Sequence, residues 1–148
     1  MIKAVKLTQI IITANLLIAS SIIIKMYGFR DLKGMVGGFP LSFAIGIAGL
    51  YFAGNFVGKR MDYYINVRHF NAVMTGIAGL FLILFFGIVV GSTVGFLKEV
   101  IPGVRVGNIG DAAVDYYVKP FFWIVLFGFL PTIVMGGVLG ICIKKINN

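Results

Sequence analysis

Two carboxylates in one polar segment are the residues of this chain best suited to catalysis. Asp111 and Asp115 lie between Lys98 and Lys119, and a pair of acids, one protonated and one ionised, can activate a water molecule against a peptide bond. The same spacing also has a purely structural explanation. Asp111 is a natural N-cap if a helix starts after it, and Asp115 then forms an ion pair with Lys119 one turn later. We predict this second arrangement, which needs no catalysis.

The residues around Asp111 resemble part of a known family of membrane enzymes. Gly107-Asn108-x-x-Asp111 is similar to the GNxxD portion of lipoprotein signal peptidases, which are also small four-helix membrane proteins. The resemblance implies a membrane-embedded aspartyl hydrolase, but it covers only these few residues. Ala112 stands where the family has an arginine, no second FNxxD-like segment follows, and the first apolar stretch lacks an aspartate. The sequence therefore favours a protein that is not an enzyme, with the hydrolase as the least favoured alternative.

The other residues offer little material for catalysis or for a metal site. Cys142 is the only cysteine and His69 the only histidine, so a multi-cysteine metal site and bis-histidine haem ligation are excluded within one chain. We expect no catalytic residues, no metal and no cofactor. The net charge of +8 does not indicate nucleic acid, because the 13 Lys and Arg residues lie almost entirely between apolar runs. Basic residues in such places anchor a protein at a membrane surface.

Four apolar stretches must position these residues. Hydrophobic residues make up 59% of the 148 and charged residues 12%, which is far from the composition of a soluble domain. The stretches without Lys, Arg, Asp, Glu or His are 7–24, 41–58, 70–97 and 121–143. Each can span a bilayer, and backbone polar groups in lipid require helices. We therefore predict one all-α membrane domain, 1–148, that is a four-transmembrane-helix bundle with a structured outer loop, 98–119, between its third and fourth helices.

An alternative is three spans and one re-entrant or surface segment, with 41–58 as the stretch that does not span. In either arrangement the four stretches lack the charged residues and histidines that proton relays, voltage sensors and most ion-coupled carriers place within the bilayer. The sequence therefore argues against a proton-driven machine.

Small residues recur at helix-packing intervals in three of the stretches. They are Ser42, Gly46, Gly49 and Ala53 in the second, Gly87, Gly91 and Gly95 in the third, and Gly136 and Gly140 in the fourth. Such faces let helix backbones approach closely, which favours association in lipid. Two interpretations stay open: packing within one chain, and association between chains. The pentapeptide Gly-Ile-Ala-Gly-Leu also occurs twice, at 46–50 and 76–80, which we interpret as a coincidence of composition.

Polar residues form a second pattern in the first stretch. Gln9, Thr13 and Ser20 project from one face at about 100° per residue, and Asn15 lies on a neighbouring line. Asn55, with Tyr51 one turn earlier, can face this polar seam from the second stretch. We interpret the seam as interhelical hydrogen bonding, with a polar conduit or a partner groove as the alternative.

The basic residues give an expected orientation. With the N-terminus inside, the cytoplasmic side carries seven Lys and Arg and the outer side six, so we expect both termini in the cytoplasm of a bacterial-type inner membrane. Lys59, Arg60 and Arg68 would lie at anionic lipid headgroups. The leading hypothesis is a non-enzymatic membrane subunit that associates through its Gly-rich faces, either with itself as a homo-oligomer or with other membrane subunits. The alternative is a small oligomeric channel or uncoupled carrier.

Overall fold

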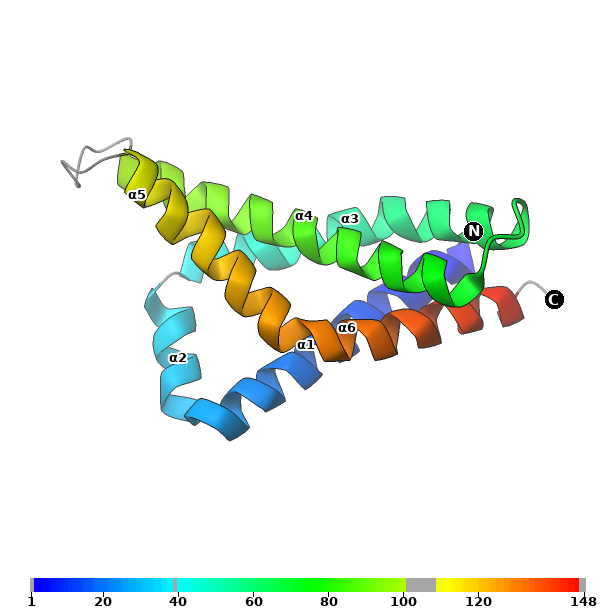
Figure 1. The fold of residues 1–148 in the computed structure, drawn as a ribbon, viewed down its shortest axis with the longest axis horizontal. Coiled ribbons are helices and arrows are strands. Elements are labelled where there is room, and N and C mark those ends of the chain that lie inside the picture. Colours follow the sequence, from blue (N-terminus) through cyan, green and yellow to red (C-terminus); the bar gives the residue numbers. More distant parts are fainter. Residues whose placement is uncertain (1, 39, 101–108, 147–148) are drawn as a thin grey trace.

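The computed structural model describes residues 2–38, 40–100 and 109–146, almost all of them helical (Figure 1). The elements are α1 (Ile2–Tyr27), α2 (Phe29–Gly38), α3 (Pro40–Asn66), α4 (Ala72–Val100), α5 (Ile109–Ala113), the π-helix η1 (Val114–Val118) and α6 (Lys119–Ile146). Four helices in the described ranges are long and apolar enough to cross a membrane. They contain three of the predicted stretches whole and the stretch 70–97 from Ala72 onward, so the helical prediction is confirmed, including that for 41–58.

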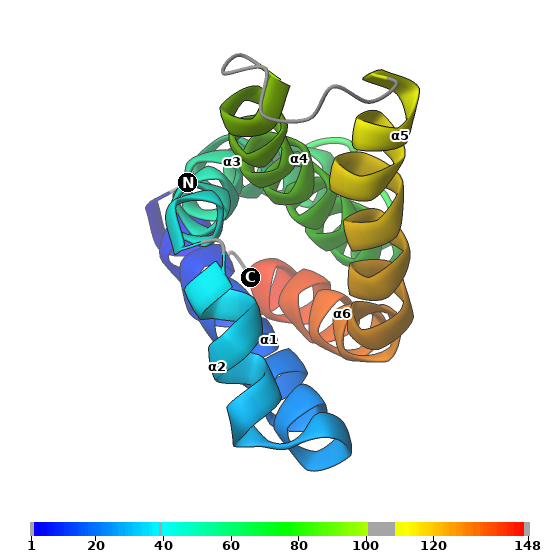
Figure 2. The same cartoon turned by 90° about the vertical axis from the view of Figure 1, so that its left-hand side faces the viewer.

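The four long helices surround one core. Seen from the end of the bundle opposite the termini, α1, α3, α4 and α6 follow one another around the molecule (Figure 2), and each contacts the next. The largest side chains fully buried among them are Leu80, Ile83, Leu139, Ile143, Thr8 and Thr132. The helices alternate in direction, so that α1 begins and α6 ends at the same end of the bundle (Figure 1). We call this end, which also holds the α3–α4 turn, the termini end.

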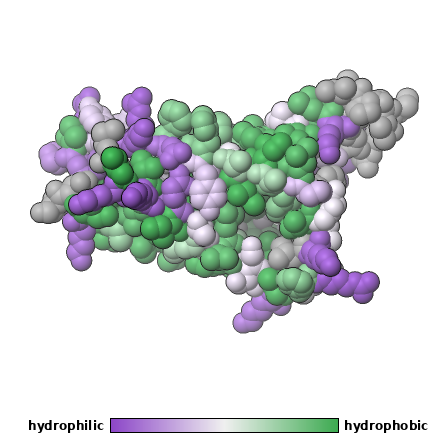
Figure 3. All heavy atoms as spheres, turned by 180° about the vertical axis from the view of Figure 1, so that it is seen from behind, coloured by the Kyte–Doolittle hydropathy of each residue, from purple (hydrophilic) through white to green (hydrophobic). Residues whose placement is uncertain are grey.

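Hydrophilic residues gather at both ends of the molecule, and hydrophobic residues cover most of the surface between them (Figure 3). The helices run past their apolar stretches into these polar ends. For example, α3 continues to Asn66, whereas its predicted span ends at Gly58. A stretch without charged residues indicates only the part of a helix that lies in the apolar layer. Because Lys and Arg are good helix formers, the helix can continue through them beyond that layer.

The start of α4 differs from the prediction because of a cap. The apolar stretch begins at Phe70, but the helix begins at Ala72, because Asn71 caps it. The Asn71 Oδ1 accepts hydrogen bonds from the backbone N–H groups of Val73, at 3.0 Å, and Met74, at 3.2 Å. These are donors that the first turn of a helix cannot satisfy by itself.

Replacing Asn71 with Ala is expected to lower the free energy of unfolding by about 1 kcal/mol, because it removes this cap. Thermal unfolding in detergent, followed by circular dichroism, measures the loss. Asn71→Ser retains a capping oxygen and should lie close to the wild type. An equal loss in both variants would show that the side-chain cap does not stabilise the turn.

The sequence did not predict α2. Residues 25–40 were expected to be a connection, but a turn at Gly28 (φ +89°) ends α1 and starts a second, short helix. The three glycines of α2 lower its helix propensity. Its mixture of charged and apolar residues, Phe29 and Arg30 among them, places it at the polar end opposite the termini (Figure 1).

The outer segment is only partly as expected. Residues 101–108, with Gly107 and Asn108 of the peptidase-like motif, lie outside the described residues. From 109 onward the segment is helical and leads through η1 directly into α6, so one helix covers Gly110–Ile146. The described part is therefore an extension of the fourth helix rather than a separate loop. Asp111 lies in the first turn of α5 and is not an N-cap, because the helix begins two residues earlier, at Ile109.

Candidate functional site

The small-residue faces of α3 and α4 lie against each other. A methyl group on Gly91 would lie 3.2 Å from the Cα of Gly46 and 3.0 Å from the carbonyl oxygen of Ser42. A methyl group on Gly49 would lie 3.3 Å from the Cβ of Val90. At such distances an added methyl group requires the facing helix to shift by a few tenths of an ångström. Glycine therefore favours the close approach of the two backbones here.

The other two predicted members of this group have different neighbours. A methyl group on Gly95 would lie 2.7 Å from the ring of Tyr116 and 3.3 Å from the Oγ of Ser42, so Gly95 accommodates an aromatic side chain from η1. Ala53 is buried in the central apolar core.

A second close contact joins α4 to α6. A methyl group on Gly136 would lie 2.7 Å from the Cα of Ile77 and 3.0 Å from the carbonyl oxygen of Gly76. The backbone of Gly140 passes Gly76 and Ala72 equally closely. Gly76 was not among the predicted packing residues, although the repeated pentapeptide marked it. Gly46 and Gly76 each begin a copy of that pentapeptide, and each lies where its helix meets the next most closely.

The predicted glycine faces are thus occupied within one chain. They pack α3 on α4 and α4 on α6 and are not open to a second molecule. The third-helix face that would line a path in the channel hypothesis packs against α3 instead.

The polar seam of α1 is divided between two helices. Its first part contacts α3: the Nε2 of Gln9 donates to the carbonyl oxygen of Tyr51 at 2.9 Å and to the Oδ1 of Asn55 at 3.0 Å. The Oγ1 of Thr13 and the Oη of Tyr51 are 2.7 Å apart and share a hydrogen bond. We call Gln9, Thr13, Tyr51 and Asn55 the α1–α3 polar cluster. Thr13 and Asn55 are exposed on the outside of the bundle, and the Oε1 of Gln9 is buried with no hydrogen-bond partner in the part of the chain that the structure describes.

The second part faces α6. Asn15 is 3% exposed, and its Nδ2 lies 3.4 Å from the Oγ1 of the fully buried Thr132. The Oδ1 of Asn15 has no hydrogen-bond partner among the described residues. Thr132 follows Pro131, a proline inside α6. Ser20 shares the face of Gln9 but is half-buried further along α1, outside both groups.

Asp115 of the outer segment is paired with a lysine. Its Oδ1 and the Nζ of Lys119 are 2.5 Å apart, which confirms the predicted ion pair, and Asp111 is exposed. Within the described ranges no three residues among His, Cys, Asp and Glu gather to form a possible metal site. The ion pair gives local support to the start of the α6 helix.

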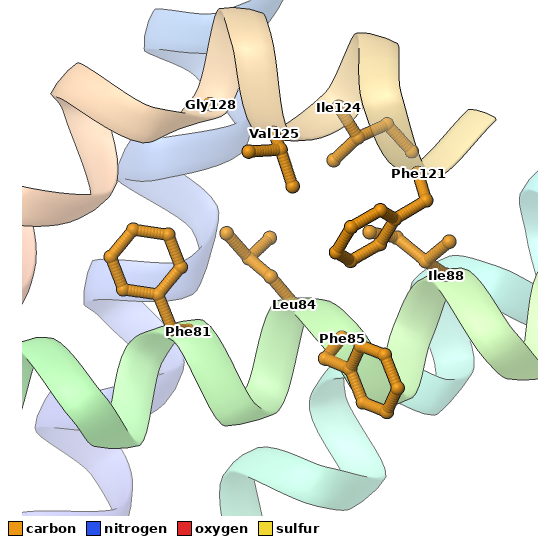
Figure 4. Close-up of a pocket in the computed structure, with 8 residues that line it drawn as sticks. All are labelled: Phe81, Leu84, Phe85, Ile88, Phe121, Ile124, Val125 and Gly128. Carbon is orange, nitrogen blue, oxygen red and sulfur yellow. The ribbon is translucent and has the colours of Figure 1, made fainter. Parts of the chain in front are cut away.

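A cavity of about 200 Å³ lies between α4 and α6, further from the termini end than the glycine contact between these two helices (Figure 4). Its lining is wholly apolar: Phe81, Leu84, Phe85, Ile88, Phe121, Ile124, Val125 and Gly128. The two helices separate here because large side chains replace the glycines. With no polar group in its lining, the cavity offers no catalytic chemistry.

The chain matches no protein-family model, no curated protein and no solved structure. What its fold defines is a class: a bundle with four apolar helices, consistent with a polytopic membrane protein.

Proposed function

We propose that the chain is a non-enzymatic integral membrane subunit that associates with further copies of itself through the α1–α3 polar cluster. It spans a bacterial-type inner membrane four times, with both termini in the cytoplasm. The observation that supports association most strongly is the position of Thr13 and Asn55. They are polar and exposed on the outer surface of the bundle, whereas the glycine faces are already filled inside the chain.

The depth of the cluster explains why it favours a partner over lipid. Thr13 lies seven residues beyond Lys6, which is about 10 Å along a helix with a rise of 1.5 Å per residue. A hydrocarbon core is about 30 Å thick. With Lys6 at the headgroups, Thr13 and Tyr51 therefore lie well inside the apolar layer. Polar side chains at that depth are more stable against another polar surface than against acyl chains.

The chemistry of the cluster favours a second copy of the same chain. The amide of Asn55 has both donors and an acceptor, so two such amides can pair with each other across a two-fold axis. Asn and Gln are among the side chains that join transmembrane helices by hydrogen bonds.

The orientation is supported by the charges at the termini end. It carries seven of the 13 Lys and Arg residues, and Asp62 is the only acid of the sequence among them. Positive residues accumulate on the cytoplasmic side of membrane proteins.

Self-association is tested with Asn55→Leu, using Phe56→Leu on the adjacent exposed position as the control. We expect the wild type to be oligomeric in mild detergent and in bilayers. Asn55→Leu should weaken association about threefold to tenfold, the range for one interhelical polar contact. Light scattering after size-exclusion chromatography, and energy transfer between labelled copies in liposomes, give the two readouts.

Three outcomes would contradict the proposal. A wild type that is strictly monomeric both in mild detergent and in bilayers would exclude self-association. If a different membrane protein co-purifies with the wild type but not with Asn55→Leu, the partner of the cluster is a subunit of a larger complex and not a second copy. Solute flux in liposomes would favour the channel hypothesis over a subunit role.

A further inference from the structure

A groove at the termini end combines basic and aromatic side chains. It has a volume of about 690 Å³ and lies where α3 ends and turns into α4. The residues of its lining that matter here are Lys59, Arg60, Tyr63, Tyr64, Arg68 and Phe70. All six are exposed. Their exposed side chains can therefore contact a ligand.

The charges in the groove favour an anion. Lys59, Arg60 and Arg68 contribute three positive charges, and Asp62 is the acid in the lining. Asp62 is only 7% exposed, and its Oδ1 accepts a hydrogen bond from the Nδ2 of Asn66 at 2.7 Å. The carboxylate is thus directed into the protein, and the exposed surface of the groove is positive.

Arg68 is held in position by Tyr63. Its Nε donates to the Tyr63 Oη at 3.3 Å, and its guanidinium carbon lies 5.9 Å from the centre of the Tyr63 ring. A guanidinium has five N–H donors in a planar fork that matches phosphate oxygens. Since Tyr63 engages the Nε side, the two terminal nitrogens can donate to an anion. Held in this way, Arg68 loses less side-chain entropy when it binds.

The backbone of the turn is also fixed. His69 has a φ of +56°, a left-handed backbone conformation that residues other than glycine rarely adopt. The N–H of Arg68 donates to the carbonyl of Tyr63, and that of Phe70 donates to the carbonyl of Tyr64. These two hydrogen bonds define the bend between Arg68 and Phe70, which both line the groove.

The other side of the groove is apolar. The rings of Tyr64 and Phe70 are stacked with their centres 5.5 Å apart. Phe70 lies just before α4, and therefore at the edge of the apolar surface of the bundle. Positive charge beside stacked aromatic rings at that level is the arrangement found where proteins meet lipid headgroups.

We propose that this groove binds the phosphate of an anionic phospholipid from the leaflet at the termini end. Arg60, Arg68 and Lys59 bind the phosphate oxygens, and the glycerol and the start of the acyl chains lie over Tyr64 and Phe70. The proposal rests on membrane insertion but not on self-association, so the Asn55→Leu experiment and this one fail independently.

The test compares the double variant Arg60→Gln/Arg68→Gln with Arg30→Gln, an arginine on α2 at the opposite end of the bundle. Binding of phosphatidylglycerol and of phosphatidylcholine to the detergent-purified protein is measured by native mass spectrometry. We expect the wild type to prefer phosphatidylglycerol and the double variant to bind it about tenfold more weakly, since each basic side chain contributes to headgroup attraction. Arg30→Gln should bind as the wild type does, and both variants should keep the wild-type melting temperature.

Several results would overturn the proposal. They are equal binding of the two lipids by the wild type, an equal loss of binding in Arg30→Gln, and displacement of the lipid by an equimolar amount of inorganic phosphate. The last of these would assign the site to a soluble anion. Arg68→Lys keeps the charge but not the planar fork, so an intermediate affinity supports phosphate binding by the fork, and wild-type affinity contradicts it.

Discussion

Gly140→Ala is expected to be the most damaging single-methyl change in the bundle. The added Cβ would meet the carbonyl group of Ala72, with 2.6 Å to its carbon atom. Backbone atoms of α4 cannot rotate away as a side chain can, so the two helices must separate. We expect a loss of about 3 kcal/mol or more in the free energy of unfolding, at the upper end of the cost of overpacking. Circular dichroism and the fluorescence of Trp123 during thermal unfolding in detergent measure it.

Gly137→Ala on the same helix is the matched control. A methyl group there would meet only the Cγ1 of Val73, at 3.6 Å, which is ordinary van der Waals contact. Both changes remove one glycine and add the same helix propensity, so the difference between them isolates the close approach. If the two variants melt alike, the α4–α6 backbones are not as close as described. If Gly140→Ala melts normally but loses an oligomer, the glycine face belongs to an interface between chains.

These glycines illustrate what the sequence could reveal about packing. The spacing of Gly87 and Gly91, or of Gly136 and Gly140, predicts a face for close approach, because residues at i and i+4 share one side of a helix. It does not say which helix meets that face. Gly76 and Gly79 have the same spacing as Gly46 and Gly49, but Gly79 packs against Met61 of α3, and only the pairing of α4 with α6 makes the role of Gly76 visible.

The polar seam shows a similar limit. Gln9 and Thr13 were correctly placed opposite Tyr51 and Asn55, because both lines follow from helical periodicity. Asn15 lies two residues after Thr13, about 200° around the helix. It therefore faces α6. The sequence alone could not predict this contact, because it does not reveal that α1 packs between α3 and α6. Ser20 shares the face of Gln9 but lies 11 residues, about three helical turns, further along α1.

The basic groove was only partly foreseen. Lys59, Arg60 and Arg68 were expected at headgroups because basic residues flank apolar runs. The ring contacts of Tyr63 and Tyr64 and the left-handed His69 depend on how α3 ends, which helical periodicity does not determine.

The second large effect is expected at Asn15, where two substitutions should act in opposite directions. Asn15→Leu removes a buried carbonyl oxygen that has no hydrogen-bond partner and loses only a long contact to Thr132. The Thr132 hydroxyl can instead donate to the carbonyl one turn earlier in its own helix. We expect Asn15→Leu to raise the free energy of unfolding by about 1 kcal/mol. Asn15→Asp should lower it by about 3 kcal/mol, the cost of a carboxylate in the middle of a transmembrane helix.

Asn71→Asp is the control for the acidic substitution, because an aspartate caps a helix as well as an asparagine does and Asn71 is exposed. Thermal unfolding of the three variants in the same detergent gives the comparison. The opposite result, in which Asn15→Leu is destabilising and Asn15→Asp is tolerated, would mean that water or another polar species reaches Asn15 in the membrane. A buried amide that needs such a species belongs to a polar path between α1 and α6. That outcome would favour the conduit over simple interhelical hydrogen bonding.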